Sequence, residues 1–306
     1  MLASKWFTVT GTQVLQGLGA VYGGAFNAVA EATDGLEGRD AFFIQVVHAF
    51  KPEPLTPQDV IIRIPYANPE SFKADMAASV ERGWLEAVGE EQYMVSDKGA
   101  EVAARLVKAL NGALAGVESL PKADLERICD LLQKVVDRAY ELPEPAEKWV
   151  LEWGKYFDKA LVVEGAPALI KVRRRTMDVF SFRDDGHVAA WKAREENGQI
   201  WEAFTFVWRG DASDAAELAE KLAFRNYDEA SYAAALDELA ARGWVAQEGD
   251  KYVATDKGKE LRQGVEDATD RCFDVPWDAL TKAETEELKS LMERLTEAVK
   301  PSEENE

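Results

Sequence analysis

One stretch of this chain occurs twice, and the repetition limits the fold more than any other feature of the sequence. The later copy, Asp214 to Leu261, contains a helix start with an acidic cap, a turn, a second helix and two short apolar runs around a Glu-Gly-Asp turn. The earlier copy begins at Thr56 and has the same elements in the same order. Helix, turn, helix and two-stranded ribbon are the outline of a winged helix. The sequence therefore predicts two related winged units.

The two copies agree most closely where the second helix ends and the ribbon follows. Thr56 and Asp214 each precede an acidic residue by three positions, which predicts a cap whose carboxylate partner reaches back to the cap amide. The apolar runs predict hairpin wings at about 84–95 and 244–254. The matching segments are Glu81-Arg82-Gly83-Trp84-Leu85 with Ala241-Arg242-Gly243-Trp244-Val245, Tyr93 with Tyr252, and Ser96-Asp97-Lys98-Gly99 with Thr255-Asp256-Lys257-Gly258.

The rest of the sequence divides into two halves around these units. A chain of 306 residues has two domains by default, and the repeat gives the same number. We expect a mainly α fold with small β-hairpin wings, built as tandem duplicated winged-helix units. The predicted parts are a first half at 1–142, a linker with a connector helix at 143–166, a second half at 167–299 and a disordered tail at 300–306.

The N-terminal region contains no charged residue from Trp6 to Ala30. Glutamines, asparagine and several glycines dilute its apolar character, so it falls short of a membrane span. We expect a buried helix, in which Gly19 and Gly23 allow another helix to approach closely. A cleaved signal ending at Ala28-Val29-Ala30 is the alternative.

The chain is strongly acidic, with a formal net charge of −20. Such a chain is repelled by nucleic acid and by anionic lipid unless cations gather on one face. Adaptation to a salt-rich cytoplasm is another explanation of the acidity. Cys129 and Cys272 do not occupy equivalent repeat positions, so we expect reduced thiols in a cytoplasmic protein.

These motifs carry a resemblance. The repeated unit, with Arg-Gly-Trp at the end of its second helix, looks like the winged helix of MarR-type transcriptional regulators. The run from Arg183 to Trp191, followed by Trp201-Glu202-Ala203-Phe204 and Trp208-Arg209-Gly210, resembles bacterial SalK-like double winged-helix proteins. The resemblance covers nearly all of the second half and the first half more loosely. It implies a helix-turn-helix regulator and carries no settled activity or cofactor.

The charge of the expected recognition helices argues against DNA binding through them. The segment from Ser71 to Arg82 has two cations against two acidic residues, and Asp228 to Arg242 has one cation against four. Proteins that bind DNA commonly neutralise about 6–10 phosphates. The densest basic cluster lies elsewhere, and it could face phosphate, an anionic ligand or the acidic groups of its own fold. We favour the last for these residues: Lys171, Arg173, Arg174 and Arg175.

A second candidate site lies in the SalK-like motif. On a helix, Arg183, His187 and Trp191 share one face, and Asp184 lies beside His187. A carboxylate beside an imidazole can set its tautomer, as a general base requires. The favoured alternative is a buried polar network that orients the aromatic core. With only two histidines in the chain we expect no metal site, and no Ser-His-Asp, phosphate-loop, thiolate or DNA-glycosylase motif stands out.

The function predicted from the sequence is that of a helix-turn-helix regulatory protein that responds to a small ligand, and DNA is a candidate partner that the acidic wings and recognition helices disfavour. Its ligand wall would consist of Arg183, Asp184, His187, Trp191 and Trp201. One alternative is a winged-helix scaffold that has lost DNA binding and binds a protein, a second copy of itself or a small molecule. The third is an enzyme that uses His187, although a non-enzymatic role is favoured. We expect no cofactor and no membrane partner.

Overall fold

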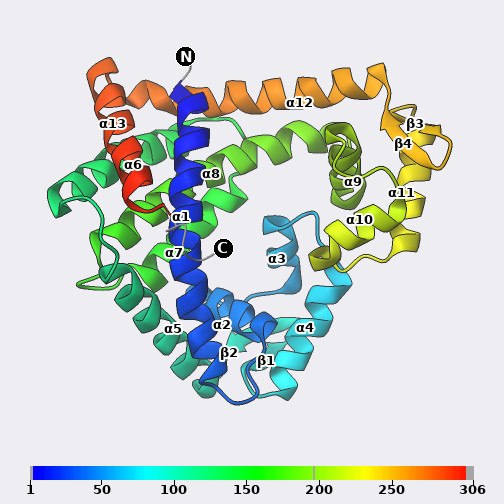
Figure 1. Ribbon diagram of the computed structural model, residues 1–306. Helices are drawn as coiled ribbons and strands as arrows, with labels where there is room; N and C mark the ends of the chain where they lie inside the picture. Colours follow the sequence, from blue (N-terminus) through cyan, green and yellow to red (C-terminus); the bar gives the residue numbers. More distant parts are fainter. Residues whose placement is uncertain (1–2, 196, 301–306) are drawn as a thin grey trace. The chain divides into compact units, whose positions relative to one another are not determined.

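The computed structural model describes residues 3–195 and 197–300 and is mainly helical, with two small antiparallel hairpins (Figure 1). This confirms the expected mainly α class with wings. The first half contains α1 (Ala3–Glu31), α2 (Gly38–Phe50), α3 (Pro57–Arg63), α4 (Pro69–Glu81), β1 (Leu85–Gly89), β2 (Gln92–Val95), α5 (Asp97–Ala115) and α6 (Lys122–Glu141). Then follow α7 (Trp149–Leu161), α8 (Ala168–Lys192), α9 (Gly198–Arg209), α10 (Ala215–Lys221), η1 (Ala223–Arg225), α11 (Glu229–Ala241), β3 (Val245–Glu248), β4 (Lys251–Ala254), α12 (Asp256–Asp274), η2 (Val275–Ala279) and α13 (Lys282–Ala298).

The chain packs into two compact units that interleave along the sequence. The first unit runs to Leu55, continues at Met76–Asp185 and resumes at Cys272, and the second contains Thr56–Asp75 and Gly186–Arg271. The helices α4, α8 and α12 therefore each pass from one unit into the other. The halves at 1–142 and 167–299 are defined by the sequence repeat, whereas these units are defined by which residues pack together. The two divisions therefore answer different questions, and the halves stay a prediction. Apart from Lys300, the predicted tail lies outside the described residues.

In the first unit, α1 packs against α5 and α13. Phe7, Val14 and Leu18 are fully buried in this core. The close approach occurs at Gly17, where an added Cβ would overlap the backbone of Val299. The expectation for Gly19 and Gly23 is therefore wrong, because no described atom lies within 4 Å of a Cβ at either position. Nowhere in 3–195 or 197–300 is a helix both long and apolar enough to cross a bilayer.

The connector helix α7 is a packed part of the first unit. Its first amides are capped by Asp185, whose carboxylate oxygens accept hydrogen bonds from Val150 N at 2.8 Å and Leu151 N at 2.9 Å. A carboxylate at a helix start satisfies free amides and is stabilised by the helix dipole. Trp153 is buried, and Trp149 is 46% exposed.

The core of the second unit is built around α9 and α11, whose buried side chains include Trp201, Phe204 and Leu236. The helix starts behave largely as the sequence predicts. The Asp228 carboxylate accepts from Ser231 N at 2.8 Å, and the Asp214 carboxylate accepts from Glu217 N at 2.8 Å. The prediction that the Glu217 carboxylate accepts from the Asp214 amide is wrong. The carboxylate accepts instead from Ser213 N, one residue earlier.

The two hairpins form where the repeat predicts them. In the first, Leu85 pairs with Val95, and in the second, Val245 pairs with Ala254. A glycine with positive φ ends the helix before each hairpin, Gly83 at +77° and Gly243 at +69°. This left-handed conformation favours glycine and explains the repeated Arg-Gly-Trp motif.

The helix after each hairpin is held by the same contacts. The Ser96 hydroxyl proton is shared between Gly83 O at 2.8 Å and Trp84 O at 3.0 Å. The Thr255 hydroxyl proton is shared in the same way between Gly243 O at 2.7 Å and Trp244 O at 3.2 Å. Each hydroxyl also caps its helix by accepting an amide three residues on. That amide belongs to a glycine in both cases, and any larger residue there would overlap the tryptophan carbonyl. The Ser/Thr-Asp-Lys-Gly motif is thus explained by local packing.

Candidate ligand pocket and winged-helix surfaces

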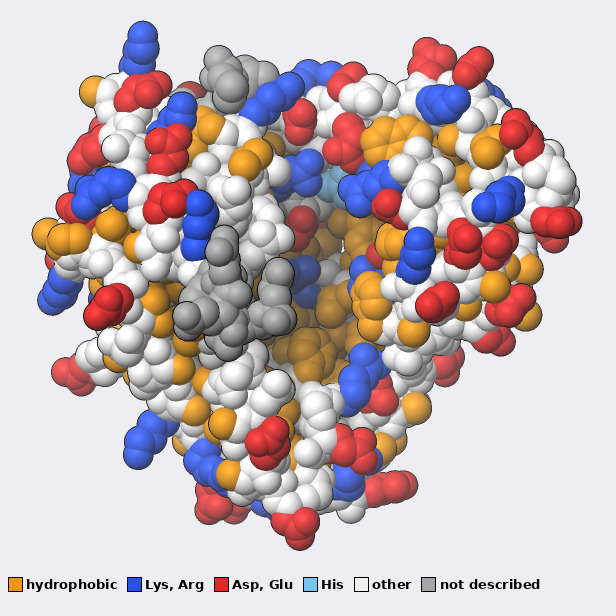
Figure 2. Space-filling model, in the orientation of Figure 1, with side chains coloured by type: hydrophobic (Ala, Val, Ile, Leu, Met, Phe, Trp, Pro, Cys, Tyr) orange, Lys and Arg blue, Asp and Glu red, His pale blue; other side chains and the backbone are white. Residues whose placement is uncertain are grey.

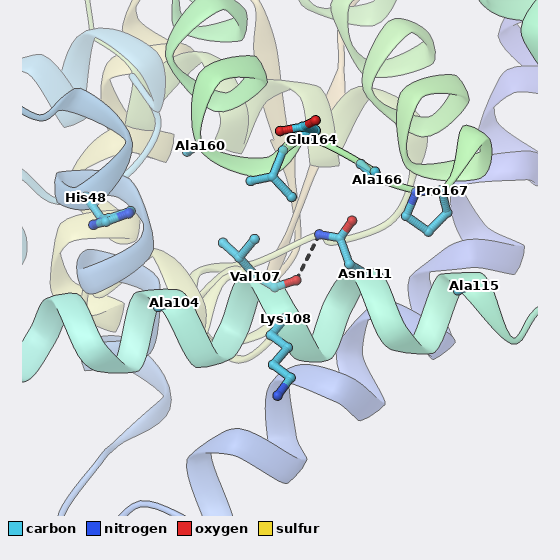
Figure 3. A pocket seen from close by; sticks show the side chains of 12 residues that line it. His48, Ala104, Val107, Lys108, Asn111, Ala115, Ala160, Glu164, Ala166 and Pro167 are labelled. Atoms are coloured by element: carbon cyan, nitrogen blue, oxygen red, sulfur yellow. Dashed lines mark hydrogen bonds between the residues drawn. The ribbon is translucent and has the colours of Figure 1, made fainter.

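The first unit contains an open pocket of about 530 Å³, which we call the α2–α5 pocket (Figure 3). It is bounded by α2, by α5 and by the segment that joins α7 to α8. Its volume falls in the range of small-molecule sites, about 300–1,000 Å³. The lining is mainly apolar and consists of His48, Ala104, Val107, Lys108, Asn111, Ala115, Ala160, Val163, Glu164, Gly165, Ala166 and Pro167.

The helical period of α5 explains which side chains reach the pocket. Leu106, Leu110 and Leu114 lie on the face that is buried in the core. Val107 and Asn111 stand one turn apart on the adjoining face, so they line the cavity together (Figure 3). An amide in an otherwise small and apolar stripe is the signal by which the sequence could have revealed this site.

The amide of Asn111 is held against the backbone beside the pocket. Its Nδ2 donates to Val107 O at 2.9 Å and to Leu161 O at 3.5 Å (Figure 3). Both partners are carbonyl oxygens and can only accept, so they fix which end of the amide carries the nitrogen. The Oδ1 atom is buried and has no hydrogen-bond partner among the described residues.

His48 lies across the pocket on α2. Its ring is partly buried, and its Nδ1 has no hydrogen-bond partner within the described residues. Burial, with a smaller contribution from Lys51, lowers the pKa of His48 below its ordinary 6.5. The imidazole is therefore uncharged at neutral pH. Asn111 Oδ1 and His48 Nδ1 are thus both buried without a hydrogen-bond partner among the described residues, and neither atom is open to the pocket.

The two charged side chains of the pocket lining, Lys108 and Glu164, are both exposed. Figure 3 shows the Lys108 side chain pointing away from the other lining residues, and it is exposed. Glu164 is exposed in the segment between α7 and α8. The pocket is therefore open to solvent, with a mainly apolar lining and its two charged side chains exposed.

The residues predicted as a ligand wall have other surroundings. Trp191 and Trp201 are buried and stack with their ring centroids 6.0 Å apart. The Trp191 Nε1 donates to the Tyr66 hydroxyl at 3.0 Å. These two rings fill the core of the second unit.

The polar members of that predicted wall lie along α8, on either side of the division between the two units. His187 Nδ1 lies 3.1 Å from Thr269 Oγ1, which itself donates to Val265 O. The histidine therefore donates from Nδ1, which sets its tautomer. Arg183 and the exposed Asp184 belong to the first unit. The acid of this motif with a clear structural task is Asp185, the α7 cap, which the sequence did not single out.

The basic cluster on α8 is largely engaged within the first unit. Arg174 and Arg175 pair with Asp178, and Arg175 also pairs with Asp158. The Arg173 guanidinium lies over the Tyr22 ring at 3.9 Å from its centroid. Lys171 is exposed. The sequence favoured ion pairs between this cluster and the chain's own acids. Two of its four cations, Arg174 and Arg175, form such pairs.

The arginine shared by both repeats is also neutralised internally. Arg82 Nη2 lies 2.7 Å from the buried Asp40, and Arg242 pairs with the buried Glu195 and with Glu238. Both arginines end the helix that would enter a DNA groove. Neither guanidinium is left as a free phosphate contact.

The outer face of α11 and the second hairpin is acidic, as Figure 2 shows over this region. Tyr252, on the hairpin, donates its hydroxyl to Asp237 at 3.1 Å. Arginine, lysine, asparagine and glutamine are the usual base-reading side chains, and the exposed part of α11 carries none of them. The exposed residues of α11 are Glu229, Ala230, Ala233, Ala234, Asp237, Glu238 and Ala241.

Comparison with known proteins adds one finding. Residues 181–304 match the model of a helix-turn-helix family. No curated protein and no solved structure matches the chain. The matched range includes α10, α11 and the hairpin of β3 and β4. The second half of the chain therefore contains a helix-turn-helix domain.

Proposed function

We propose that the chain is a helix-turn-helix regulatory protein that binds a small, mainly apolar molecule in the α2–α5 pocket. The observation that carries the proposal is the pocket itself, with a volume of about 530 Å³ and a mainly apolar lining. An apolar ligand that fills the pocket would remove apolar surface from water, which contributes roughly 25 cal/mol per Å².

Thermal unfolding of the full chain with a panel of small apolar molecules tests the proposal. Replacing Ala104, an exposed lining residue of α5, by tryptophan should occupy the pocket and abolish the ligand-induced shift. The matched control is Ala77→Trp, which changes an exposed alanine of α4 that does not line the pocket. Equal shifts for the wild type and both variants would refute binding in this pocket.

The second candidate function is a winged-helix scaffold that has lost DNA binding, and the neutralised Arg82 and Arg242 favour it. Fluorescence anisotropy with labelled duplex DNA between about 50 and 200 mM salt separates the two candidates. A basic DNA-binding face would lose several orders of magnitude in affinity over that range. Absence of binding at the lower salt would support the scaffold, whereas tight and salt-dependent binding would support a DNA-binding regulator.

We also infer that the two winged units derive from one duplicated unit of the MarR type. The recurring contacts of Ser96 and Thr255 with the tryptophan carbonyls support this inference. Gly99 and Gly258 support it too, because a side chain at either position would overlap the neighbouring tryptophan carbonyl. A solved structure in which the two winged units failed to superimpose would refute the duplication.

A further inference from the structure

We propose that a monatomic anion of the chloride type binds beside the Arg173 guanidinium, in a narrow cavity of the first unit. The cavity lies between α1, α5, the end of α7 and α8. It shares no lining residue with the α2–α5 pocket, so this inference stands apart from the proposed function. The lining consists of Tyr22, Leu110, Leu161, Ile170, Arg173 and Arg174.

The ion cluster on α8 is one negative charge short. Three consecutive arginines, Arg173 to Arg175, lie beside two described carboxylates, those of Asp158 and Asp178. Arg174 and Arg175 each pair with both of these acids. Arg173 forms no ion pair and no hydrogen bond with any residue that the structure describes. A bound monoanion would therefore balance the charge of the cluster.

The surroundings of Arg173 make an unpaired charge costly. Its guanidinium lies over the Tyr22 ring, 3.9 Å from the centroid, so one face of the group is covered. Its Nε is buried without a partner, whereas Nη1 and Nη2 are not among the buried atoms of the described residues. Burial is the main cause that lowers the pKa of Arg173, and the charge of Arg174 acts in the same direction. An anion that accepts from the two Nη groups would offset this cost.

The size of the cavity decides which anion it takes. Its volume is about 10 Å³, which is close to the space for one water-sized sphere. Chloride is only slightly larger than a water molecule, and it accepts hydrogen bonds from any direction. Acetate and phosphate have several heavy atoms and exceed this space. No acid lines the cavity, and three of its walls are the aliphatic side chains of Leu110, Leu161 and Ile170.

The NMR line width of chloride in a solution of the full chain tests the site. The line broadens when the ion exchanges with a protein site, and the excess over protein-free buffer measures binding. Arg173→Gln should weaken chloride binding by about tenfold or more, because it removes the charge and both Nη donors. The matched control is Lys171→Gln, which removes the same charge from an exposed position of the same helix and should keep the wild-type broadening.

Competition with other anions tests the size requirement. Bromide should remove the excess broadening at concentrations similar to those of chloride, whereas acetate and phosphate at the same ionic strength should not. If Arg173→Gln fails to fold, crystals of the wild type grown in bromide still decide the question. Anomalous scattering would then locate the ion beside Arg173 or show none there, and its absence would overturn the site.

The other outcomes also separate the anion site from its alternatives. Equal broadening in the wild type and in Arg173→Gln would overturn the site. An equal loss in Lys171→Gln would overturn it too, because the ion would then only gather near the surface charge of α8. Displacement by acetate or phosphate as efficient as that by bromide would overturn the assignment to a monatomic anion. None of these results bears on the α2–α5 pocket, which is tested with apolar molecules and Ala104→Trp.

Discussion

The helices α5 and α12 follow the two hairpins in the same way, yet their next turns have diverged. Both begin beside a tryptophan carbonyl that excludes any residue but glycine, Gly99 in α5 and Gly258 in α12. Four positions later α5 has a buried alanine, Ala103, and α12 has the buried Arg262. The Arg262 guanidinium lies over the rings of Trp201 and Trp208, at 5.2 and 4.9 Å. A packed polar network therefore occupies the second unit at this point.

The faces of the two helices differ in the same sense. On α5, the residues that line the pocket are Ala104, Val107, Lys108, Asn111 and Ala115. At the same distances from the glycine, α12 carries Gln263, Glu266, Asp267, Asp270 and Asp274. Five largely small or apolar side chains thus correspond to four acids and an amide. One copy can line an apolar ligand site and the other cannot, although both keep the contacts that fix the hairpin.

Replacing the shared glycines should have the largest effect. Gly99→Ala and Gly258→Ala each place a Cβ on a tryptophan carbonyl and should reduce the free energy of unfolding by roughly 3 kcal/mol. Gly112→Ala in α5 and Gly264→Ala in α12 meet no described atom within 4 Å and should stabilise by about 0.5–1 kcal/mol. Urea unfolding compares the four variants. A large loss at only one of the shared glycines would break the likeness between the hairpins.

Removing the arginine that distinguishes α12 should rank next. Arg262→Ala removes the ion pair with Glu266 and uncovers two tryptophans. Breaking a buried pair costs about 3–5 kcal/mol, and since Glu266 is 25% exposed we expect about 2–3 kcal/mol, measured by urea unfolding. Arg271→Ala, at an exposed position of the same helix, is the control. If the two losses were equal, Arg262 would not be the residue that fills this part of the second unit.

The hydroxyl that caps each helix should make a smaller and equal contribution. Ser96→Ala and Thr255→Ala each remove an acceptor for a helix amide and a donor to a tryptophan carbonyl. Loss of such a cap costs about 1 kcal/mol. Thermal unfolding should give similar losses for the two variants. A difference well above that value would show that the two hairpins are held by different forces.

The smallest expected effect concerns pH and the first half alone. The pKa of His48 is lowered in the folded protein, mainly by burial, so the unfolded chain binds its proton more readily. Stability should therefore fall as the pH drops through the ordinary value of 6.5. His48→Phe should make this decline less steep between about pH 7.5 and pH 5.5. An unchanged slope in urea titrations would mean that His48 is not shielded in the wall of the pocket.

Much of the fold could be predicted from local signals, and the site could not. The helix caps at Asp228 and Thr56 and the hairpins at 84–95 and 244–254 depend on residues only a few positions apart. The ligand wall was predicted from the helical spacing of residues on α8. That spacing shows which side chains share a face, but not which elements pack against that face. Trp191 and Trp201 turned out to stack in a core, because an aromatic stripe serves packing as readily as binding.

The sequence by itself determined the order of the elements, the positive φ at Gly83 and Gly243, and the acidity of the outer face of α11. These features follow from side-chain size, backbone freedom and charge within short segments. Only the tertiary structure decided that Arg82 would be neutralised by Asp40, which lies 42 positions earlier in the sequence. It also decided that His48 and Asn111 would line one cavity. Such pairings depend on which helices pack together, because the contacts are made across the core and not along the chain.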